Sequence, residues 1–338
     1  MTVRDTAAGT ESATRIVTAG DPAVAEAARV LTAGGLVAFP TETVYGLGAD
    51  AGNGEAIARL YAAKGRPAFN PLIAHVASAP AARKLARFDA FADRLAAAFW
   101  PGPLTLVLPK AQRCPVADLA TAGLDSIAVR VPAHPAAAEI LRTFGRPVVA
   151  PSANRSGHVS PTTAAHVLAD LGGRIDLIID GGATPVGLES TIVACLAESF
   201  GAPALLRPGG VPRAAIEDVL GRPLADATAG TTGKNAPRAP GMLASHYAPR
   251  TPLRLGAKEV GASEALLAFG PALAAGASGA VKILNLSARG DPIEAAANLF
   301  SYLRALDAIG ANAIAVMPIT HDGIGEAIND RLRRAAAP

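Results

Sequence analysis

The sequence predicts an α/β protein made of one mixed sheet with flanking helices, followed by a second, smaller Rossmann-like α/β domain. Short β-branched runs alternate with alanine-rich helical stretches along most of the 338 residues. The alternation breaks once, between Gly221 and Pro252, in a stretch dense in Gly, Pro, Thr and Ala. Half of all residues are hydrophobic, which suffices for buried cores, and the length fits two domains of roughly 100–200 residues each.

The first part of the chain carries most of the predicted elements. Strands are predicted at Leu36–Phe39, Leu72–Val76, Leu104–Leu108, Ile127–Val131, Val148–Ala150, Leu177–Ile179, Thr191–Cys195 and Ala204–Arg207. Helices are predicted at Pro22–Ala33, Gly54–Ala63, Ala90–Phe99, Pro135–Phe144, Pro161–Leu171 and Pro212–Leu220. The helix at Pro161–Leu171 has the clearest start, because Ser160 can cap it and Pro161 fits the first turn, where its missing N–H costs nothing.

A shorter βα pattern follows the break. It predicts strands at Val281–Leu286 and Ala313–Met317, a helix at Pro292–Ile309 and a last helix from about Gly325 to Ala336. No glycine-rich nucleotide fingerprint accompanies it. We therefore expect a first domain over residues 16–220, a linker over 221–252 and an accessory α/β domain over 253–338.

Charge and cysteine content exclude several classes of protein. Lys and Arg total 31 against 28 Asp and Glu, a net charge of +3 that permits a polyanionic ligand without the clustered basic stripe of a dedicated nucleic-acid binder. Cys114 and Cys195 are too few for a metal cluster and are expected to be reduced, partly buried thiols. No stretch has the roughly 20 strongly apolar residues of a membrane span. The charged N-terminus does not resemble a signal peptide, so a cytoplasmic location is expected.

A polar turn follows the first predicted strand, in the segment FPTETVYGLG. Its polar side chains are Thr41, Glu42, Thr43 and Tyr45. They lie at the carboxyl end of the strand, where α/β proteins place ligands. An ordinary capped turn has the same composition, so this segment alone leaves both interpretations open.

Two cations follow in a Gly/Pro loop at the end of a predicted helix. Lys64 and Arg66 could clamp a triphosphate, Lys as a point charge and Arg as a bidentate fork. Two solvated charges favoured by the helix dipole are an equal alternative. Further on, Ser126 and Arg130 lie on the same face of a strand, and an arginine in an apolar strand must meet an anion or lie at an edge.

Small hydroxyl and amide turns recur after later strands, at Pro151–Asn154, Gly187–Thr191 and Leu206–Gly210. Each could bind phosphate oxygens or simply cap a turn. His75 lies in an apolar strand, either as a core imidazole or facing a substrate, and the six histidines show no metal-ligand spacing. No nucleophile elbow, Walker lysine or HExxH motif occurs. The residues themselves therefore predict a phosphate-binding α/β enzyme of unspecified reaction.

These motifs occur in a fixed order: PTETVYGLG, KGRPAFNPLIAHV, WPGPLTLVL, AGLDSIAVRVPAHP, PVVAPSANRSG, SPTTA, IIDGG, GLESTIV and LLRPGG. Taken together they resemble the core of the threonylcarbamoyl-AMP synthase family. The linker APRAPGMLASHYAP and the ending GIGEAINDRLRRAA resemble the long form of that family, which carries a C-terminal accessory domain. The resemblance extends from about Ile16 to Ala336 and implies a YrdC-like mixed twisted sheet for the first domain.

The resemblance implies an L-threonylcarbamoyladenylate synthase, a nucleotidyltransferase. Such an enzyme uses L-threonine, bicarbonate and ATP, with Mg²⁺, to form threonylcarbamoyl-AMP and pyrophosphate. The product would feed the threonylcarbamoyladenosine modification of tRNA, so a downstream tRNA threonylcarbamoyl transferase complex is an implied partner. Weak affinity for tRNA itself is compatible with the net charge, and no membrane partner is implied. The resemblance identifies no metal ligand in the chain.

Carried over position by position, the family pattern implies residues for each substrate. Those implied around L-threonine are Thr41, His75, Arg130, Ala150 and Ser190. Those implied around ATP are Lys64, Arg66, Asn70, Ser126, Ser152, Asn154, Ser160, Arg207 and Tyr247. Lys64 and Arg66 are the implied catalytic residues, which with magnesium spread the triphosphate charge, while Arg130 holds the threonine carboxylate as a fork. Tyr247 of the linker would close over the nucleotide as a lid.

The residue types suit this reaction. The amine of threonine adds to carbon dioxide or bicarbonate, and the resulting carbamate must attack the α-phosphorus of ATP, so the site must neutralise charge and align two negative partners. A carbamoyl transferase of the hydrogenase-maturation kind shares a related core, but two cysteines cannot supply its zinc ligands. An RNA-binding module needs exposed basic residues with stacking aromatics, which an aromatic content of 4% disfavours.

Overall fold

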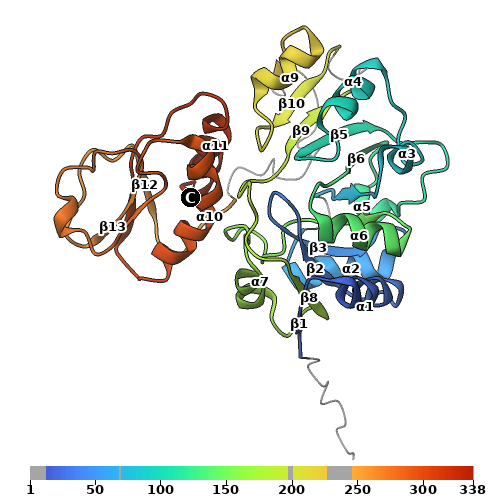
Figure 1. The fold of residues 1–338 in the computed structure, drawn as a ribbon, viewed down its shortest axis with the longest axis horizontal. Coiled ribbons are helices and arrows are strands. Elements are labelled where there is room, and N and C mark those ends of the chain that lie inside the picture. Colours follow the sequence, from blue (N-terminus) through green and yellow to red (C-terminus); the bar gives the residue numbers. More distant parts are fainter. Residues whose placement is uncertain (1–12, 68–69, 197–200, 227–245, 338) are drawn as a thin grey trace, which may run out of the picture.

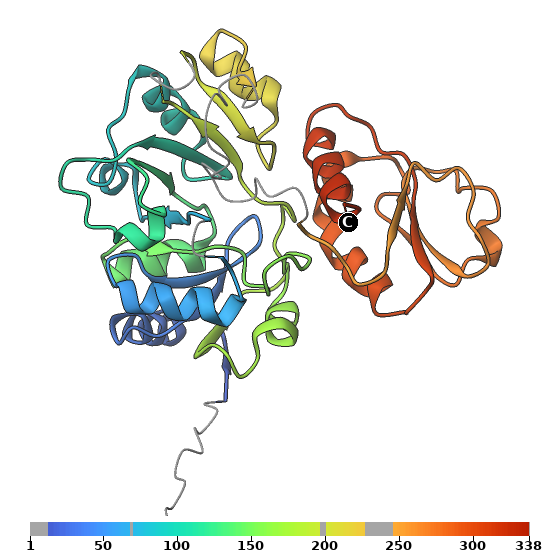
Figure 2. The same ribbon diagram turned by 180° about the vertical axis from the view of Figure 1, so that it is seen from behind.

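The computed structural model describes residues 13–67, 70–196, 201–226 and 246–337. Its strands form two sheets, an 11-stranded mixed sheet from the first part of the chain and a 4-stranded parallel sheet from the last part. In Figure 1 the second domain, in orange and red, lies to one side of the first, and Figure 2 shows the same arrangement from behind. The predicted α/β class, mixed sheet and smaller Rossmann-like domain are confirmed.

The large sheet has the strand order β1-β8-β2-β3-β7-β4-β6-β5-β9-β10-β11. Its strands are β1 (Arg15–Thr18), β2 (Val37–Pro40), β3 (Tyr45–Asp50), β4 (Ile73–His75), β5 (Leu104–Pro109), β6 (Ser126–Arg130), β7 (Val148–Val149), β8 (Leu177–Asp180), β9 (Thr191–Ala194), β10 (Ala204–Arg207) and β11 (Ala225–Asp226). The β2/β3 and β5/β6 pairs are antiparallel, whereas β4/β6 and β5/β9 are parallel. Strands that are distant in the chain thus become neighbours at the centre of the sheet.

Helices cover both faces of this sheet. They are α1 (Asp21–Thr32), α2 (Gly54–Lys64), α3 (Ala79–Ala82), α4 (Ala90–Phe99), α5 (Asp118–Thr121), α6 (Pro135–Phe144), α7 (Ala164–Leu171) and α9 (Arg213–Leu220). Successive side chains of a strand point to opposite faces, so Ala38 joins the core under α2 and α7 while Val37 and Phe39 join the core under α1 and α6. A sheet covered on both faces leaves its strand ends as the places where a ligand can bind.

The predicted elements of the first domain are present, several with the predicted ends and the others with ends shifted by a few residues. Three strands of the large sheet, β1, β3 and β11, lie outside the prediction, and β11 falls within the predicted linker. β1 is a largely exposed edge strand without an apolar run. β3 contains Gly46 and Gly48, which lower strand propensity. A Cβ at Gly48 would lie 2.7 Å from the Phe39 ring, so glycine permits the close approach of β2 and β3.

The helix predicted at Pro161–Leu171 begins three residues later, at Ala164. Thr163 caps it, because its Oγ1 accepts the N–H of His166 at 3.3 Å. The prediction that Ser160 caps this helix is wrong, since its hydroxyl donates to Glu189 instead. The Pro161 carbonyl accepts the N–H of Tyr45 at 2.9 Å, which holds the segment against β3 rather than in a helical turn.

The second sheet has the order β12-β15-β13-β14. Its domain contains β12 (Leu253–Leu255), β13 (Glu264–Ala268), the 3-10 turn η2 (Ala277–Gly279), β14 (Ile283–Asn285), α10 (Pro292–Asp307), β15 (Ala313–Val316) and α11 (Gly325–Ala335). The side chain of Asp291 caps α10 by accepting two backbone N–H groups. β12 and β13 lie outside the prediction, and the β13 sequence EALLA has the composition of a helix, so parallel pairing overrides its local propensity.

One apolar cluster joins the two domains. Val44, Val159 and Leu188 of the first domain belong to the same buried cluster as Leu299 and Phe300 of α10. Polar contacts accompany this packing, and one of them is an ion pair of 2.7 Å between a guanidinium of α10 and a carboxylate of α7. The cavity described below therefore lies beside a packed interface between domains.

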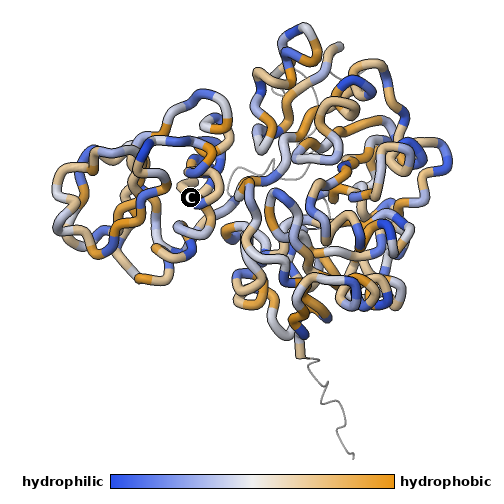
Figure 3. Tube along the Cα trace, in the orientation of Figure 1, coloured by the Kyte–Doolittle hydropathy of each residue, from blue (hydrophilic) through white to orange (hydrophobic). Residues whose placement is uncertain are grey.

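Apolar residues are distributed through the interior of both domains (Figure 3). Among the described residues, no helix combines the length and the apolar character needed to cross a bilayer. Cys114 and Cys195 are free thiols, one half-buried and one buried, as predicted. Burial raises the pKa of the Cys195 thiol to about 12, so this side chain is an unreactive part of the core.

Candidate functional site

Most of the predicted site residues converge on a small cavity between the sheet, the turn after β2 and the chain that enters the second domain. The cavity has a volume of about 50 Å³. Its lining residues are Thr43, Val44, Arg66, Ile73, His75, Arg130, Ala150, Pro151, Ser152, Glu189, Ser190, Arg207, His246 and Tyr247. This lining includes members of both predicted sets, the one for threonine and the one for ATP, so the structure brings the two sets to one place.

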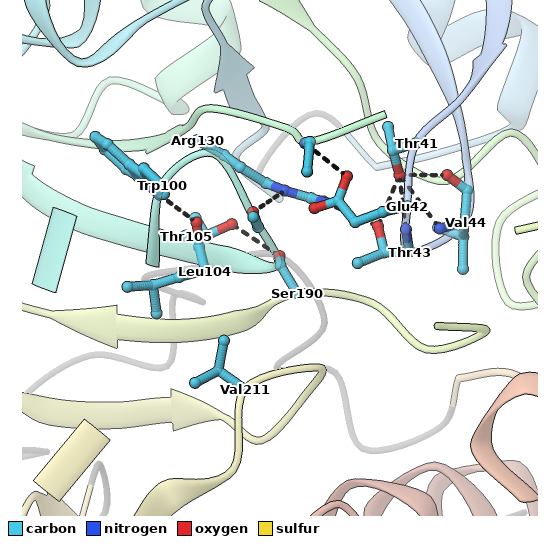
Figure 4. Close-up of polar contacts among 12 residues, drawn as sticks. Thr41, Glu42, Thr43, Val44, Trp100, Leu104, Thr105, Arg130, Ser190 and Val211 are labelled. Carbon is cyan, nitrogen blue, oxygen red and sulfur yellow. Dashed lines mark hydrogen bonds and ion pairs between the residues drawn. The ribbon is translucent and has the colours of Figure 1, made fainter. Parts of the chain in front are cut away.

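Arg130, at the end of β6, is the centre of a buried polar network (Figure 4). Its Nη2 donates to Glu42 Oε1 at 2.6 Å, its Nη1 to Thr43 Oγ1 at 3.0 Å and its Nε to the Gly102 carbonyl at 3.2 Å. The other carboxylate oxygen of Glu42 accepts the N–H of Ala133. A guanidinium has five N–H donors, so these three bonds leave two for a substrate carboxylate.

Glu42 holds this arginine and remains ionised. Burial acts to raise the pKa of Glu42, but the charge and hydrogen bond of Arg130 and the N–H of Ala133 lower it below its usual range. The pair is nearly enclosed, with 4% of the Arg130 side chain and 10% of the Glu42 side chain exposed. Glu42 belongs to the polar turn but to neither predicted substrate set, and its buried pairing with Arg130 gives it a role in the site.

Thr41 shapes the turn after β2, as Figure 4 shows. Its Oγ1 donates to the Val44 carbonyl at 2.7 Å and accepts from Thr43 Oγ1 at 2.7 Å. Thr43 lines the cavity, whereas Thr41 is buried behind it. The hydroxyl of Thr41 is thus committed to the turn, and its predicted contact with threonine stays a prediction.

Ser190 directly precedes β9 and is fixed from two sides. Its Oγ lies 2.8 Å from Thr105 Oγ1, and Arg207 at the end of β10 donates to its carbonyl at 2.8 Å. The loop after β10 approaches so closely that a Cβ at Gly209 would lie 2.4 Å from the Ser190 carbonyl carbon. The glycines of the LLRPGG motif therefore have a structural reason, which is to bring β10 and Ser190 together.

His75 presents a neutral imidazole to the cavity. Burial lowers the pKa of His75 to about 3, and the charge of Arg130 acts in the same direction. Its Nδ1 lies 3.2 Å from the Ile73 carbonyl. A carbonyl only accepts, so Nδ1 carries the proton and Nε2 keeps a lone pair that can accept a hydrogen bond from a substrate.

Lys64 and Arg66 are placed by the end of α2. Gly65 adopts the left-handed conformation, with φ 60°, which ends the helix between them. Lys64 Nζ donates to the carbonyl of Ser152 at 2.6 Å and to that of Asn154, and Arg66 Nη2 donates to a backbone carbonyl at 3.2 Å. Within the described ranges, neither cation forms an ion pair with a carboxylate.

This burial without a counter-charge disfavours the charged forms of both side chains. Burial lowers the pKa of Lys64 well below its usual value, and the neighbouring charge of Arg66 lowers it further. Burial also lowers the pKa of Arg66 to about 10. A phosphate group bound beside them would restore their charges, so the electrostatics of this part of the cavity favour an anionic ligand.

Buried polar atoms without a hydrogen-bond partner gather around the same place. In the part of the chain that the structure describes, they include Arg66 Nε, Asn70 Oδ1, Asn154 Oδ1 and His246 Nδ1. Such atoms are rare in native proteins because each costs about 1–3 kcal/mol of desolvation. These atoms include hydrogen-bond donors and acceptors, so they suit a ligand that has both acceptor and donor groups.

Five of the residues predicted to contact ATP do not line the cavity. Lys64, Asn70 and Asn154 are linked to its lining residues by hydrogen bonds. The other two are Ser126 and Ser160. Ser126 begins β6, at the opposite end of that strand from Arg130, and does not line the cavity. Ser160 is fully buried behind Glu189, to which it donates. Their contacts with ATP stay predictions.

The chain entering the second domain closes one side of the cavity. Tyr247 is 1% exposed and stacks on Phe300 with 5.6 Å between ring centroids. Its ring also meets the His246 ring edge-on, with 4.1 Å between the centroids. Its φ of 65° lies in a region that residues other than glycine rarely adopt, so packing holds it there. Residues 227–245 of the predicted linker lie outside the described residues.

Three site residues escaped the motif analysis, namely Glu189, His246 and Arg331. Glu189 lines the cavity, and its position inside the quoted motif GLESTIV was the available signal. His246 also lines the cavity, and its only sequence signal is its position in the linker motif APRAPGMLASHYAP. Arg331 comes from α11 and donates to Glu189 across 142 positions of sequence, a separation that no local pattern reveals.

No group of three or more His, Cys, Asp or Glu side chains within the described residues is arranged to hold a metal ion. Glu189, which lines the cavity, and Glu42, which lies beside the lining residue Arg130, are each paired with an arginine. A Mg²⁺ that arrives with nucleotide phosphates does not need such a group, because it keeps water and phosphate oxygens as ligands. The residues present are compatible with a Mg²⁺ that is held by nucleotide phosphates and water.

Comparisons with known proteins agree over both domains. The Sua5/YciO/YrdC family model, described as telomere recombination, matches residues 29–209, and the model described as threonylcarbamoyl-AMP synthase, C-terminal domain, matches residues 211–337. The threonylcarbamoyl-AMP synthase of Pyrococcus abyssi is 43% identical over 322 residues, which cover 92% of this chain and 93% of that protein. The threonylcarbamoyl-AMP synthase of Bacillus subtilis is 40% identical over 342 residues, covering 94% and 93%. The crystal structure of P. abyssi Sua5 complexed with L-threonine matches with a TM-score of 0.84 and 39% identity, over 95% of this chain and 96% of that one.

Proposed function

This chain belongs to the threonylcarbamoyl-AMP synthase family, and from that membership we propose that it is an L-threonylcarbamoyladenylate synthase. It uses L-threonine, bicarbonate and ATP to form threonylcarbamoyl-AMP and pyrophosphate, which makes it a nucleotidyltransferase. The observation that carries the proposal is that one cavity is lined both by Arg130 and His75 of the threonine set and by Arg66 and Arg207 of the ATP set. Such a cavity suits a reaction that joins an amino acid to a nucleotide.

The threonine half of the site would use the network around Arg130. Its two remaining N–H donors face the substrate carboxylate, while Glu42 and Thr43 hold the guanidinium in place. The lone pair on His75 Nε2 is suited to accept from the threonine hydroxyl or amine. The Ser190 hydroxyl, fixed by Thr105, adds a neutral donor or acceptor. This arrangement would select an amino acid with a small polar side chain.

The nucleotide half would stabilise the charge that moves during transfer. A carbamate oxygen of the substrate forms a bond to the α-phosphorus, and the bond from that phosphorus to the departing pyrophosphate breaks, so no side chain needs to act as a nucleophile. Arg66, which lines the cavity, and Lys64, which donates to the carbonyl of the lining residue Ser152, would neutralise the triphosphate. Mg²⁺, when it is bound with the nucleotide, supplies further neutralisation of the leaving group.

The segment around Tyr247 would serve as a lid over the nucleotide. A cavity of about 50 Å³ is far below the roughly 300–1,000 Å³ of ligand pockets, so ATP can enter only after this segment moves. Once closed over the product, Tyr247 would exclude the water that hydrolyses an adenylate. In the same proposal the product passes, in the cytoplasm, to a tRNA threonylcarbamoyl transferase complex, with weak affinity for tRNA itself.

Omitting either threonine or bicarbonate is expected to abolish pyrophosphate release from ATP. The physical reason is that the attacking group is the carbamate, which forms only when both are present. The measurement is pyrophosphate release with Mg²⁺ in carbon dioxide-depleted buffer, combined with mass spectrometry of the adenylate. Pyrophosphate formed at the full rate without threonine would mean plain ATP hydrolysis and would refute the proposed mechanism.

Hydrogen exchange is expected to show ligand-dependent protection of residues 236–249 when ATP and threonine bind together. Tyr247→Ala should raise loss of the adenylate relative to its formation, because the ring no longer excludes water. Tyr302→Ala, which removes a half-buried ring from the second domain, is the matched control and should leave that ratio unchanged. If the segment shows no added protection and Tyr247→Ala retains its product fully, the segment is a tether and not a lid.

A further inference from the structure

Arg331 is a fully buried arginine that crosses from the second domain to the wall of the cavity. It lies on α11 and is 0% exposed. By residue volume it is the first among the fully buried side chains of the described residues. Its Nε donates to Glu189 Oε2 at 2.8 Å, and its Nη1 donates to Asp330 at 2.7 Å. Its guanidinium also lies 5.1 Å from the Tyr247 ring centroid, behind the residue that closes the cavity. Arg331 therefore acts on the site through Glu189 and not by lining it.

Glu189 is the negative charge that this arginine meets. It lines the cavity, and its second carboxylate oxygen accepts from Ser160, so both oxygens are occupied. Burial acts to raise the pKa of Glu189, but the charges of Arg331 and Arg207 and the two hydrogen bonds lower it to about 2. The carboxylate is consequently ionised at every physiological pH while Arg331 is in place.

The balance of charge around Glu189 depends on which cation pairs with it. The charged and titratable groups around it are Arg331 on α11, Arg207 on β10, and His246 and Tyr247 of the entering chain. Ser160 adds a neutral hydrogen bond, and Asp330 acts on Arg331 and Arg207. Arg207 belongs to the predicted nucleotide set, whereas Arg331 does not line the cavity. Without Arg331, the Glu189 carboxylate would compete with a triphosphate for Arg207, and its negative charge would repel the triphosphate.

We propose that Arg331 is a positioning residue through which the second domain completes the nucleotide site. It neutralises the charge of Glu189 from outside the cavity lining, so that the cations of the cavity interact with the phosphates instead of with Glu189. This inference rests on the proposed function only in taking the anionic ligand to be ATP. It assigns the accessory domain an electrostatic role in the first domain's site. The interdomain ion pair of Arg213 with Glu326, at 2.8 Å, lies outside the cavity lining and serves as the comparison.

The test measures ATP binding to the full chain by calorimetry, with Mg²⁺ and without threonine. Arg331→Met is expected to weaken ATP binding at least tenfold, while threonine affinity changes by no more than about twofold. Adding Glu189→Gln should abolish the difference, so that Arg331→Met has no further effect in the Glu189→Gln background, where no buried charge is left unpaired. Glu326→Gln, which breaks an interdomain pair on the same helix, is the control and should bind ATP as the parent does.

A pH series separates this role from a merely structural one. In Arg331→Met the unpaired, buried Glu189 takes up a proton more readily, so its repulsion of ATP should fade between pH 8 and pH 5.5 and the affinity ratio to the parent should narrow. A structural defect would leave that ratio constant. The proposal is overturned if folded Arg331→Met binds ATP like the parent, if the ratio is independent of pH, or if Arg331→Met still weakens binding tenfold in the Glu189→Gln background. If the parent chain itself binds no ATP, the proposed function fails first.

Discussion

Replacing Arg130 by methionine is expected to lower the free energy of unfolding by about 3–5 kcal/mol, because it leaves the buried carboxylate of Glu42 without its partner. The same change removes the two donors available to the threonine carboxylate. Each charge-assisted hydrogen bond contributes about 1.5–3 kcal/mol, so the loss of one weakens threonine binding roughly 10- to 150-fold, and the loss of both weakens it further. Chemical denaturation measures the first effect and calorimetry with threonine the second.

The double variant Arg130→Met/Glu42→Gln separates these two effects. Removing the carboxylate charge as well should restore much of the lost stability, since no uncompensated charge remains in the core. Threonine affinity should stay low, because the donors are still missing. A double variant that binds threonine as tightly as the parent would limit Arg130 to a structural role.

Replacing Lys64 by methionine is expected to lower the rate of adenylate formation by about 100- to 1,000-fold, the range for loss of one preorganised donor to a developing charge. Threonine affinity should not change, and the fold should tolerate the substitution, because a buried cation becomes an apolar side chain of similar length. Single-turnover pyrophosphate release measures the rate. Lys84→Met, at an exposed lysine of the same domain, is the control.

Proton uptake gives a second, independent measure of Lys64. Burial lowers the pKa of Lys64 well below its usual value, and a bound triphosphate raises it again. ATP binding should therefore take up protons, increasingly as the pH rises through the lowered pKa, and ATP affinity should fall over the same range. Calorimetry in buffers of different ionisation enthalpy measures this uptake. Its persistence in Lys64→Met would assign the proton to another group.

The sequence predicted the architecture where local signals and tertiary packing agree. β5 and β9 are apolar runs buried on both faces, and their composition alone identifies them as strands. β3 and β13 were not identified, because glycines in one and helix-forming residues in the other contradict their final pairing. The start of α7 was predicted from a good cap, Ser160, whose hydroxyl the folded chain uses elsewhere. Local propensity cannot reveal such long-range competition.

In the site, too, local sequence signals identify some residues, and long-range contacts decide the roles of others. Lys64, Arg66, His75 and Arg130 could be named because each stands out beside its own strand or helix. The partners that set their chemistry could not, because pairing between Arg130 and Glu42 joins the end of β6 to the turn after β2. Contacts across the domain interface are still less accessible to motif analysis.

If Tyr247 is the proposed lid, every affinity for ATP is a composite quantity. Since a cavity of about 50 Å³ admits no nucleotide, the apparent dissociation constant equals the intrinsic one divided by the fraction of molecules that are open. A substitution that loosens the stack of Tyr247 on Phe300 enlarges this fraction and tightens the apparent binding of ATP. The same substitution shortens the residence time of the adenylate behind the ring. Variants at this interface that bind ATP more tightly should therefore release the adenylate faster.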